Sequence, residues 1–457
     1  MQFPQSSSSA ARGSATRAVA TPLAAANRLE TRLLLLVLST VVGLLLALPV
    51  SASAETVGAA VSRLQAAGAI DATLAGDARA AYADARSLRK RRTGAAREAL
   101  TFQIRNVESM ARQGRITADR VMPLFDTLRV NTDWFRNNGP AAYGADRRFS
   151  ETGRIIFEYF TGQGWEFHPL SNFAKLNGVW TDKSAPARRA LGEYAHQLIT
   201  WGVNRGGALT WEYYFPFSGS RGPFISSISQ GTAIQALARA GYALKDGTIT
   251  AAARQAMLAF DTPAPVGLKI QRDDGNHYLG YSGNRRLIIL NMFLQSLDGL
   301  HDYSVITGDQ QAWDLYSQGL IAARRETVAS DTGAWSLYSL GGPESPLSYH
   351  ELVIGFLSNL CDETTEAVFC GTRDNFQAYL KQKPMLTSIK KRARRGRISV
   401  SFKLSKISTI KVHVKGGGTA VATVGRGKRS FSVARGRSMK NTITATDLAG
   451  NVATFSK

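Results

Sequence analysis

The order of apolar and polar positions divides the chain into a long helical part and a short β part. Between about residues 150 and 384, apolar side chains recur every three to four positions, which is the period of an amphipathic helix. The apolar positions of segment 229–244 fall on one helical face. Segment 285–303 is apolar nearly all round, so we predict a buried helix there.

Residues 55–130 are rich in Ala and Arg at helical spacing, so further helices are expected before this region. The basic stretch 86–100 is predicted to be a solvated helix face or the turn of a helical hairpin, in preference to a phosphate-binding segment. No convincing strand pattern appears before residue 384. Helices that alternate with loops predict a mainly α domain over 55–384, built as a ring of helical hairpins.

The pattern changes after Pro384. Around residues 398–404 apolar and polar side chains alternate with the period of a strand, and segment 443–455 repeats this alternation around an Ala-Gly-Asn turn. Residues 385–457 are therefore predicted to form a small all-β sandwich. The sequence ATDLAGN resembles the last hairpin of bacterial immunoglobulin-like domains. A stabilising or spacing role is favoured over a specific ligand role for this module.

The first 54 residues are predicted to be an export signal or a membrane anchor. Four arginines precede the 18-residue apolar run 33–50, and Ala52-Ser53-Ala54 has the small-x-small pattern that signal peptidase cuts. Cleavage would leave Glu55 at the start of an exported protein, secreted or associated with the cell envelope. The alternative is an uncleaved anchor through 33–50, because that run approaches the length of a membrane span.

The positive charge is concentrated in the C-terminal module. The net charge is +22, yet residues 385–457 hold 17 Lys and Arg against one acidic residue, whereas residues 55–384 hold 35 basic and 32 acidic residues. For an exported module of this charge, anionic envelope polymers or phospholipid headgroups are the expected partners. Nucleic acid is a less favoured partner, and the oligomeric state is left open.

The chain has two cysteines, Cys361 and Cys370, and in an exported protein we predict that they form a disulfide across a helix-to-helix loop. Two separate thiols are the alternative. The six histidines are scattered without metal-ligand spacing, and no phosphate-binding, dinucleotide-binding, HExxH or G-x-S-x-G motif occurs. We therefore predict no cofactor and no protein-built metal site, with a divalent cation in the cleft left open. Loops rich in Tyr, Trp, Arg and carboxylates instead favour sugar binding.

A series of short motifs follows in order between residues 210 and 384. The series consists of Ser229-Gln230-Gly231 with Arg239, Leu290-Asn291, Leu297 to Asp302, Gly319, Asp331-Thr332-Gly333, Trp335 to Tyr338, and Tyr349-His350. In this order the motifs resemble the C-terminal domain of D-glucuronyl C5-epimerases. The resemblance implies an α/α toroid with a uronate-binding cleft. It also implies an isomerase that inverts C5 of uronic acid residues in an acidic, heparan sulfate-like polysaccharide.

Inversion at C5 requires removal of a proton next to a carboxylate and return of a proton on the opposite face. This chemistry needs two acid/base groups on opposite sides of the sugar ring, with donors that hold the enediolate charge. The resemblance assigns acid/base roles to Tyr338 and Tyr349, with Tyr281 as a third candidate. His350 is either a further acid/base group or a satisfied hydrogen-bonding residue.

Six residues are predicted to bind the substrate: Arg239, Gln230, Trp335, Arg285, Arg286 and Asn291. For Arg239 the alternative is an ion pair with a helix neighbour. For the arginine pair at 285–286, the alternative is the solvated start of the buried helix.

The chain departs from the family pattern in several places. Where the family has Glu-Glu-Tyr-Pro, this chain has Leu279-Gly280-Tyr281-Ser282, so both carboxylates are missing. Asp273 and Asp274 lie close upstream and are candidates to replace them. Val353 stands where the family has His, and the family's N-terminal β-rich region is not expected here, because residues 55–200 are predicted to be helical. A polysaccharide lyase and a catalytically silent glycan-binding protein therefore stay as alternative hypotheses.

Overall fold

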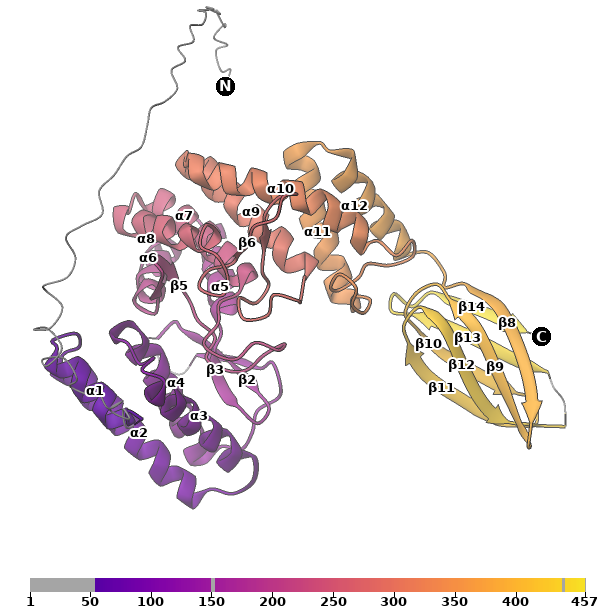
Figure 1. Cartoon of the computed structure of the whole chain (residues 1–457), viewed down its shortest axis with the longest axis horizontal. Coiled ribbons are helices and arrows are strands. Elements are labelled where there is room, and N and C mark those ends of the chain that lie inside the picture. Colours follow the sequence, from indigo (N-terminus) through magenta and orange to yellow (C-terminus); the bar gives the residue numbers. More distant parts are fainter. Residues whose placement is uncertain (1–53, 149–152, 438–439, 457) are drawn as a thin grey trace, which may run out of the picture. The chain divides into compact units, whose positions relative to one another are not determined.

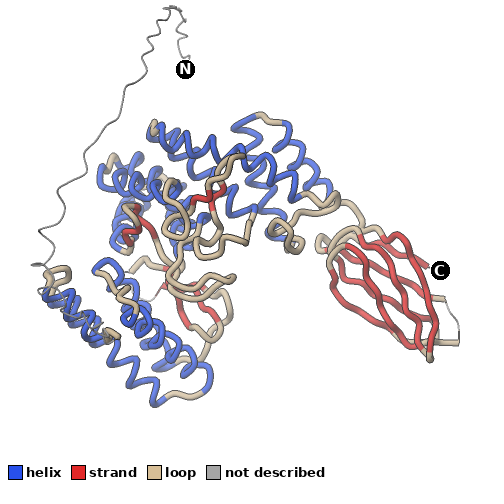
Figure 2. The backbone as a smooth tube through the Cα atoms, in the orientation of Figure 1, coloured by secondary structure: helices blue, strands red, loops and turns tan. Residues whose placement is uncertain are grey.

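The structure is a computed structural model that describes residues 54–148, 153–437 and 440–456 (Figure 1). The expected export signal lies outside the described residues, apart from Ala54. Helices make up about half of the described chain, and a region of strands follows them (Figure 2). The predicted fold class, mainly α with a C-terminal β region, is confirmed. Within the described part of the chain, no helix combines the length and the hydrophobicity that a membrane crossing requires.

The described chain begins with a four-helix region. Its helices are α1 (Val57–Ala66), α2 (Ala72–Arg91), α3 (Gly94–Arg112) and α4 (Ala118–Asn137). Helix α2 packs on both α3 and α4 through small alanine side chains at positions 75, 78, 81 and 85, whose spacing places them on one face. The basic stretch 86–100 spans the end of α2, a short connection and the start of α3, which makes it the predicted hairpin turn.

A three-stranded antiparallel sheet follows where the sequence predicts only helices. The strands are β1 (Asp146–Arg148), β2 (Ile156–Phe160) and β3 (Gly164–Phe167), in the order β1-β2-β3. The prediction of helix throughout 55–200 is wrong here. All four residues of β3 and four of the five in β2 are buried, so the single glutamate in each strand, Glu158 or Glu166, does not mark an exposed face with a period of two. Asn131 of α4 fixes the sheet edge, because its side chain accepts from the Trp165 backbone N–H and donates to the Trp165 carbonyl.

Eight helices then form four consecutive hairpins. They are α5 (Pro169–Thr181), α6 (Ala185–Thr200), α7 (Ser227–Leu244), α8 (Gly247–Met257), α9 (Leu290–Thr307), α10 (Gln310–Ser330), α11 (Leu347–Thr364) and α12 (Ala367–Tyr379). Helices α5, α7, α9 and α11 pack side by side in this order, and each carries the following helix on its other side. This two-layer arrangement of hairpins is the construction of an α/α toroid.

Helices α7 and α9 approach each other most closely at two glycines. A Cβ atom added to Gly299 would lie 2.4 Å from the Gly231 carbonyl oxygen, and one added to Gly231 would lie 2.9 Å from the backbone of Ser296. The two backbones are therefore in direct contact. Both glycines belong to the motifs that resemble the epimerase family, so those motifs include residues that serve helix packing.

Short strands and a disulfide complete the helical domain. The strands form two hairpins, β4 (Val203–Arg205) with β5 (Ala208–Thr210), and β6 (Lys269–Ile270) with β7 (His277–Tyr278), and a short 3-10 helix η1 (Leu258–Phe260) precedes the second hairpin. Cys361 on α11 and Cys370 on α12 are joined by a disulfide that ties the last hairpin together.

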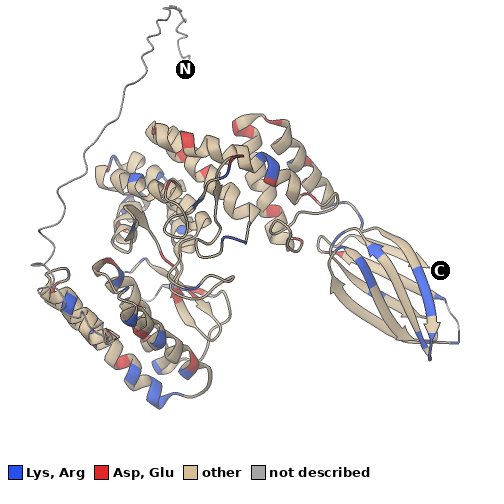
Figure 3. Ribbon diagram, viewed as in Figure 1, with Lys and Arg blue, Asp and Glu red and all other residues tan. Residues whose placement is uncertain are grey.

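The C-terminal module consists of two antiparallel sheets. Its strands are β8 (Leu386–Arg394), β9 (Arg397–Leu404), β10 (Ser408–Val414), β11 (Thr419–Val424), β12 (Gly427–Ala434), β13 (Asn441–Asp447) and β14 (Val452–Ser456). One sheet has the order β11-β10-β13-β14 and the other β12-β9-β8. The alternating apolar residues of β9 are buried in one core cluster, as the pattern predicts. Lys and Arg occur along several of these strands (Figure 3). The immunoglobulin-like character of the module stays a prediction.

Candidate active site

Four of the predicted site residues meet in one cavity of about 460 Å³. Tyr281 comes from the loop before α9, Asn291 from the first turn of α9, Tyr338 from the loop between α10 and α11, and Tyr349 from the first turn of α11. The rings of Tyr338 and Tyr349 contact edge to face, with centroids 5.4 Å apart and an interplanar angle of 84°. Three tyrosines that span almost 70 positions of the chain, Tyr281, Tyr338 and Tyr349, therefore line the same cavity.

Backbone pairing fixes the loop that carries Tyr338. The Leu340 N–H donates to the Ile288 carbonyl at 2.9 Å, which holds this loop against the segment that leads into α9. Within the loop, the Tyr338 N–H donates to the Pro343 carbonyl, also at 2.9 Å. Gly341 adopts a φ of 71° in the turn between them, a conformation that favours glycine. The backbone at Tyr338 is thus fixed by hydrogen bonds within its loop and to the segment before α9.

A carboxylate and an imidazole that were not predicted from the sequence also line this cavity. Glu158 lies on β2, and His168 is the N-cap of α5. The Oε1 atom of Glu158 lies 3.0 Å from His168 Nδ1 and accepts a hydrogen bond from the Ser171 hydroxyl. Burial would raise the pKa of Glu158, but the hydrogen bonds from His168 and Ser171 outweigh burial and lower it. Glu158 is therefore ionised at neutral pH.

A row of aromatic rings connects this pair to the phenols. The His168 ring lies 5.4 Å from that of Tyr213, Tyr213 stacks on Phe224 at 5.2 Å, and Phe224 lies 5.7 Å from Tyr281. Tyr281 is in turn hydrogen-bonded to Tyr338. The Glu158–His168 pair and the phenols thus stand at opposite ends of a row of aromatic side chains, of the kind on which sugar rings stack.

The phenols of Tyr338 and Tyr281 keep their protons at neutral pH. Burial raises the pKa of Tyr338, and the neighbouring Tyr349 raises it further, although the hydrogen bond with Tyr281 acts in the opposite direction. Burial likewise raises the pKa of Tyr281, which its neighbours Tyr338 and Tyr213 raise further. A phenol with a raised pKa keeps its proton and can deliver it only to a strong base such as a carbanion.

Asn291 supplies an amide donor without a protein partner. Its side chain is 2% exposed and lines the cavity, and its Nδ2 atom makes no hydrogen bond within the described residues. A buried amide with an unused N–H is suited to a ligand oxygen. No Lys or Arg occurs among the described residues that line this cavity. The donors available to a substrate carboxylate are therefore the Asn291 amide, the hydroxyl groups of Ser226 and Ser348, and the phenols.

His350 lies outside the cavity, so its catalytic assignment is wrong. It is fully buried, where Nδ1 lies 2.7 Å from the Ser336 hydroxyl and Nε2 donates to the Phe376 carbonyl at 3.0 Å. Its ring stacks on Trp335 with centroids 3.8 Å apart. The imidazole is thus the satisfied hydrogen-bonding residue that the sequence analysis kept as the alternative.

This environment gives His350 a predictable effect on stability. Burial lowers the pKa of His350 to about 4, from 6.5 in an exposed histidine. Between these values the unfolded chain binds a proton that the folded chain excludes, so the free energy of unfolding should fall as the pH drops from 6.5 towards 4. Urea denaturation at several pH values should show a smaller decrease for His350→Gln than for the wild type, and equal pH dependences would contradict the assignment.

Trp335 and Gln230 are also structural residues rather than substrate ligands. The Trp335 side chain is fully buried, and its indole N–H donates to the Ser345 carbonyl at 2.8 Å. The Gln230 amide donates to two backbone carbonyls, those of Leu209 at 2.7 Å and Ala256 at 2.9 Å. Neither residue lines the cavity. Their prediction as substrate-binding residues is wrong, because each satisfies buried backbone groups.

Arg239 belongs to an ion-pair network and not to the cavity. Its guanidinium donates to Asp302 Oδ2 at 2.6 Å and lies over the ring of Trp180. Asp302 also approaches His301, whose Nδ1 atom lies 3.2 Å from Glu363 Oε1. One ligand atom from each of His301, Asp302 and Glu363 lies within 4.8 Å of the others. In this arrangement the two cations neutralise the carboxylates, and the ion-pair alternative for Arg239 is the correct one.

The same network predicts a loss of stability at high pH. Contact with the carboxylates of Asp302 and Glu363 raises the pKa of His301 to about 9 from 6.5. The resulting stabilisation is complete below pH 6.5 and is lost as the pH rises through about 9, because the folded chain must then release a proton that the unfolded chain has already lost. The decrease in unfolding free energy between pH 7 and 9.5, measured by urea denaturation, should be smaller in His301→Gln. An undiminished decrease in that variant would show that other groups cause it.

The remaining candidates lie elsewhere. Arg285 and Arg286 are exposed in a turn, and helix α9 begins only at Leu290, so neither residue begins the buried helix or lines the cavity. Asp274 forms an ion pair with Arg325. Asp273 does not line the cavity either. The carboxylate of this site is Glu158, about 120 positions before the segment from which the family's pair is missing.

A family comparison covers the part of the chain that carries the phenols. Residues 205–378 match the model of the D-glucuronyl C5-epimerase C-terminus, which confirms the resemblance deduced from the ordered motifs. The matched region contains Tyr281, Asn291, Tyr338 and Tyr349, whereas Glu158 and the rest of the sheet lie before it. No curated protein sequence matches the chain.

Solved structures of low sequence identity are also similar to this chain. They include a GH76 α-mannanase from Bacteroides thetaiotaomicron (12% identity, TM-score 0.35, 47% of this chain and 59% of that chain). A second is the endo-β-1,4-glucanase CMCax from Acetobacter xylinum (12% identity, TM-score 0.30, 41% and 56%). A third is a UGL variant with dGlcA-Glc-Rha-Glc (13% identity, TM-score 0.32, 62% and 72%). The chain spans less than two thirds of the length of the first two.

Proposed function

We propose that this protein is a polysaccharide-modifying enzyme of the uronate C5-epimerase type. The observation that carries the proposal is the cavity itself. It places an ionised carboxylate with its histidine, Glu158 and His168, at one end of a row of aromatic rings and three phenols at the other. Two kinds of acid/base group on opposite sides of one sugar ring are what inversion at C5 requires.

Different residues of the cavity carry out the two proton transfers and the binding of the uronate carboxylate. The Glu158–His168 pair removes the C5 proton, since Glu158 is ionised and its Oε1 atom lies 3.0 Å from His168 Nδ1. The Tyr338 phenol returns a proton on the opposite face, with Tyr349 packed against its edge. The Asn291 amide, which has no protein partner, donates to the uronate carboxylate as the enediolate charge develops there.

Glycoside hydrolysis is a less suitable chemistry for this site. Hydrolases of that kind generally use two carboxyl groups that flank the scissile bond. Among the described residues that line the cavity, Glu158 is the single carboxylate. Proton transfer at carbon needs only one base and one opposed acid, so the composition of the cavity favours a carbanion reaction.

The substrate and the location of the enzyme are part of the proposal. An acidic polysaccharide is the substrate class that the uronate chemistry requires. Export, by cleavage before Glu55 or with an anchor at 33–50, would bring the enzyme to such polymers. The basic module at 385–457 would then make additional contact with anionic components of the cell envelope.

Deuterium incorporation tests the proposal directly. The protein comprising residues 55–457 is incubated in heavy water with several polyuronides, and NMR is used to look for deuterium and inverted configuration at C5. An unsaturated, ultraviolet-absorbing product would instead identify a lyase that uses the same carbanion. Binding without any exchange would identify a catalytically silent glycan-binding protein and refute the proposed reaction.

A further inference from the structure

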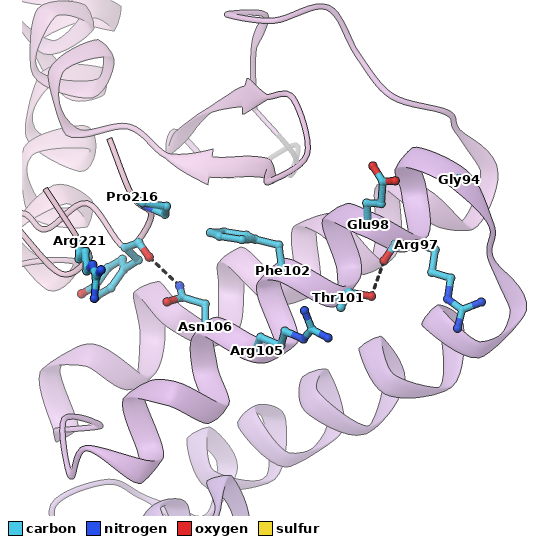
Figure 4. A pocket seen from close by; sticks show the side chains of 11 residues that line it. Gly94, Arg97, Glu98, Thr101, Phe102, Arg105, Asn106, Pro216 and Arg221 are labelled. Carbon is cyan, nitrogen blue, oxygen red and sulfur yellow. Dashed lines mark hydrogen bonds between the residues drawn. The ribbon is translucent and has the colours of Figure 1, made fainter. Parts of the chain in front are cut away.

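A second cavity, a groove of about 680 Å³, lies between α3 and the loop that precedes α7. Figure 4 shows Arg97 and Arg105 projecting from α3, with Pro216 and Arg221 on the facing loop. Arg97, Thr101 and Arg105 are spaced four residues apart, so they form one stripe along the helix. The two arginines of this stripe are separated by about 12 Å of helix rise.

The guanidinium groups of the three arginines that line this groove are available to a ligand. Arg97, Arg105 and Arg221 are exposed, and none of them makes an ion pair or side-chain hydrogen bond within residues 54–148, 153–437 and 440–456. The lining contains one carboxylate, Glu98, so the groove carries an excess of positive charge. By contrast, the nearby Arg120 is held by Glu212 at 2.7 Å. Unpaired guanidiniums are well suited to carboxylates, which they bind in a bidentate manner.

The groove shares a wall with the candidate active site. In the segment 213–217, Tyr213, Phe215 and Phe217 line the cavity of the candidate active site, which is named the tyrosine cavity after Tyr281, Tyr338 and Tyr349. Tyr214 and Pro216 line the groove. Successive side chains of this extended segment therefore face the two spaces alternately.

An aromatic side chain on α3 strengthens this connection. Phe102 lines the groove and packs against the aromatic cluster that contains Phe160, Phe215 and Tyr281, which also line the tyrosine cavity. The Asn106 amide of α3 donates to the Tyr214 carbonyl at 2.7 Å and so fixes α3 to the shared segment. The groove and the tyrosine cavity are thus neighbouring features of one part of the fold.

We propose that the groove between α3 and residues 214–222 binds an anionic stretch of the same polysaccharide whose uronate reacts in the tyrosine cavity. Arg97, Arg105 and Arg221 bind successive carboxylates of the strand, and Phe102 offers a ring for one sugar face. The substrate class rests on the proposed function. This site explains how a reaction cavity without Lys or Arg among its described lining residues can still select an acidic polymer.

A polysaccharide fits the groove better than a nucleic acid does. Single-stranded nucleic acids are bound by a series of aromatic side chains on which successive bases stack. Here the lining has one accessible aromatic ring on α3, together with guanidiniums at intervals along the helix. The shared wall also leads to a cavity whose groups suit a uronate ring. Both features favour a chain of acidic sugars.

Binding measurements on an arginine variant test this proposal. The triple variant Arg97→Ala, Arg105→Ala, Arg221→Ala in the protein comprising residues 55–457 is titrated with a long oligoglucuronate and with a glucuronate disaccharide. We expect the dissociation constant for the long chain to rise about tenfold or more, with a much weaker dependence on salt. The disaccharide should lose far less affinity, because it cannot reach from the cavity into the groove.

Arg112→Ala provides the matched control, because Arg112 is exposed on the same helix but does not line the groove. It should bind both ligands as the wild type does. An unchanged long-chain affinity in the triple variant would overturn the proposal. So would equal binding of a neutral glucan or an oligonucleotide by the wild type. Because these measurements need no turnover, a failure of C5 exchange would refute the proposed reaction while the binding data still decide the role of the groove.

Discussion

Replacing Glu158 with Gln is expected to lower the rate of C5 proton exchange by at least about 100-fold, the usual contribution of a positioned general base. The substitution keeps the shape of the side chain but removes the negative charge that faces the His168 imidazole. Neither the amide nor a histidine without its carboxylate partner can take the proton as readily. The rate of deuterium incorporation at C5 of a polyuronide measures the effect directly.

A surface carboxylate near the site serves as the control for this experiment. Glu351 is exposed in the first part of α11 and does not line the cavity, so Glu351→Gln should exchange at the wild-type rate. Thermal melting of both variants checks that they are folded. If Glu158→Gln exchanges within a few-fold of the wild type, the base lies elsewhere and the division of roles proposed for this cavity is wrong.

The fold was predictable from sequence wherever an element is amphipathic or repeats an alternating pattern. The helical hairpins have a 3.6-residue period, and β9 has a period of two, so both were predicted correctly. Strands β2 and β3 were not predicted, because both faces of these strands are buried and their single glutamates do not produce an alternation of apolar and polar residues. The start of α9 was placed too early, since the apolar run 287–289 continues the pattern of the helix without belonging to it.

The candidate site was predictable only in the half that resembles a known family. Tyr338 and Tyr349 were found because they lie in recognisable motifs. The same motifs contain Trp335 and His350, which stack on each other in the core. A sequence motif contains residues that serve packing as well as residues that serve catalysis. The residue types alone do not show which residues have which role.

Glu158 and His168 belong to no motif. They lie more than 110 positions before Tyr281, the nearest of the cavity's predicted residues, and only the folding of β2 and α5 against the hairpins brings them there. One signal was available in the sequence. A charged residue inside the aromatic run IFEYF has to be satisfied when that run is buried, which makes such a residue a candidate for a functional site.

Tyr338→Phe is expected to separate proton exchange from inversion. With the Glu158–His168 pair intact, the C5 proton is still removed from the substrate, and the same pair can return a deuteron from solvent to the same face. Without the phenol, the opposite face has no proton donor. Deuterium should therefore accumulate at C5 with retained configuration, and the ratio of inversion to exchange should fall by about tenfold or more, within the range for the loss of a general acid.

The two tyrosine variants provide the comparison that decides this assignment. Phenylalanine keeps the edge-to-face contact between the rings at 338 and 349 and removes only the hydroxyl group, so both variants should fold. NMR of the products in heavy water gives exchange and configuration from the same sample. If Tyr349→Phe separates the two events and Tyr338→Phe does not, Tyr349 is the acid. If neither does, the proton on the second face comes from another source, and the row of rings between His168 and Tyr338 binds the sugar without completing its inversion.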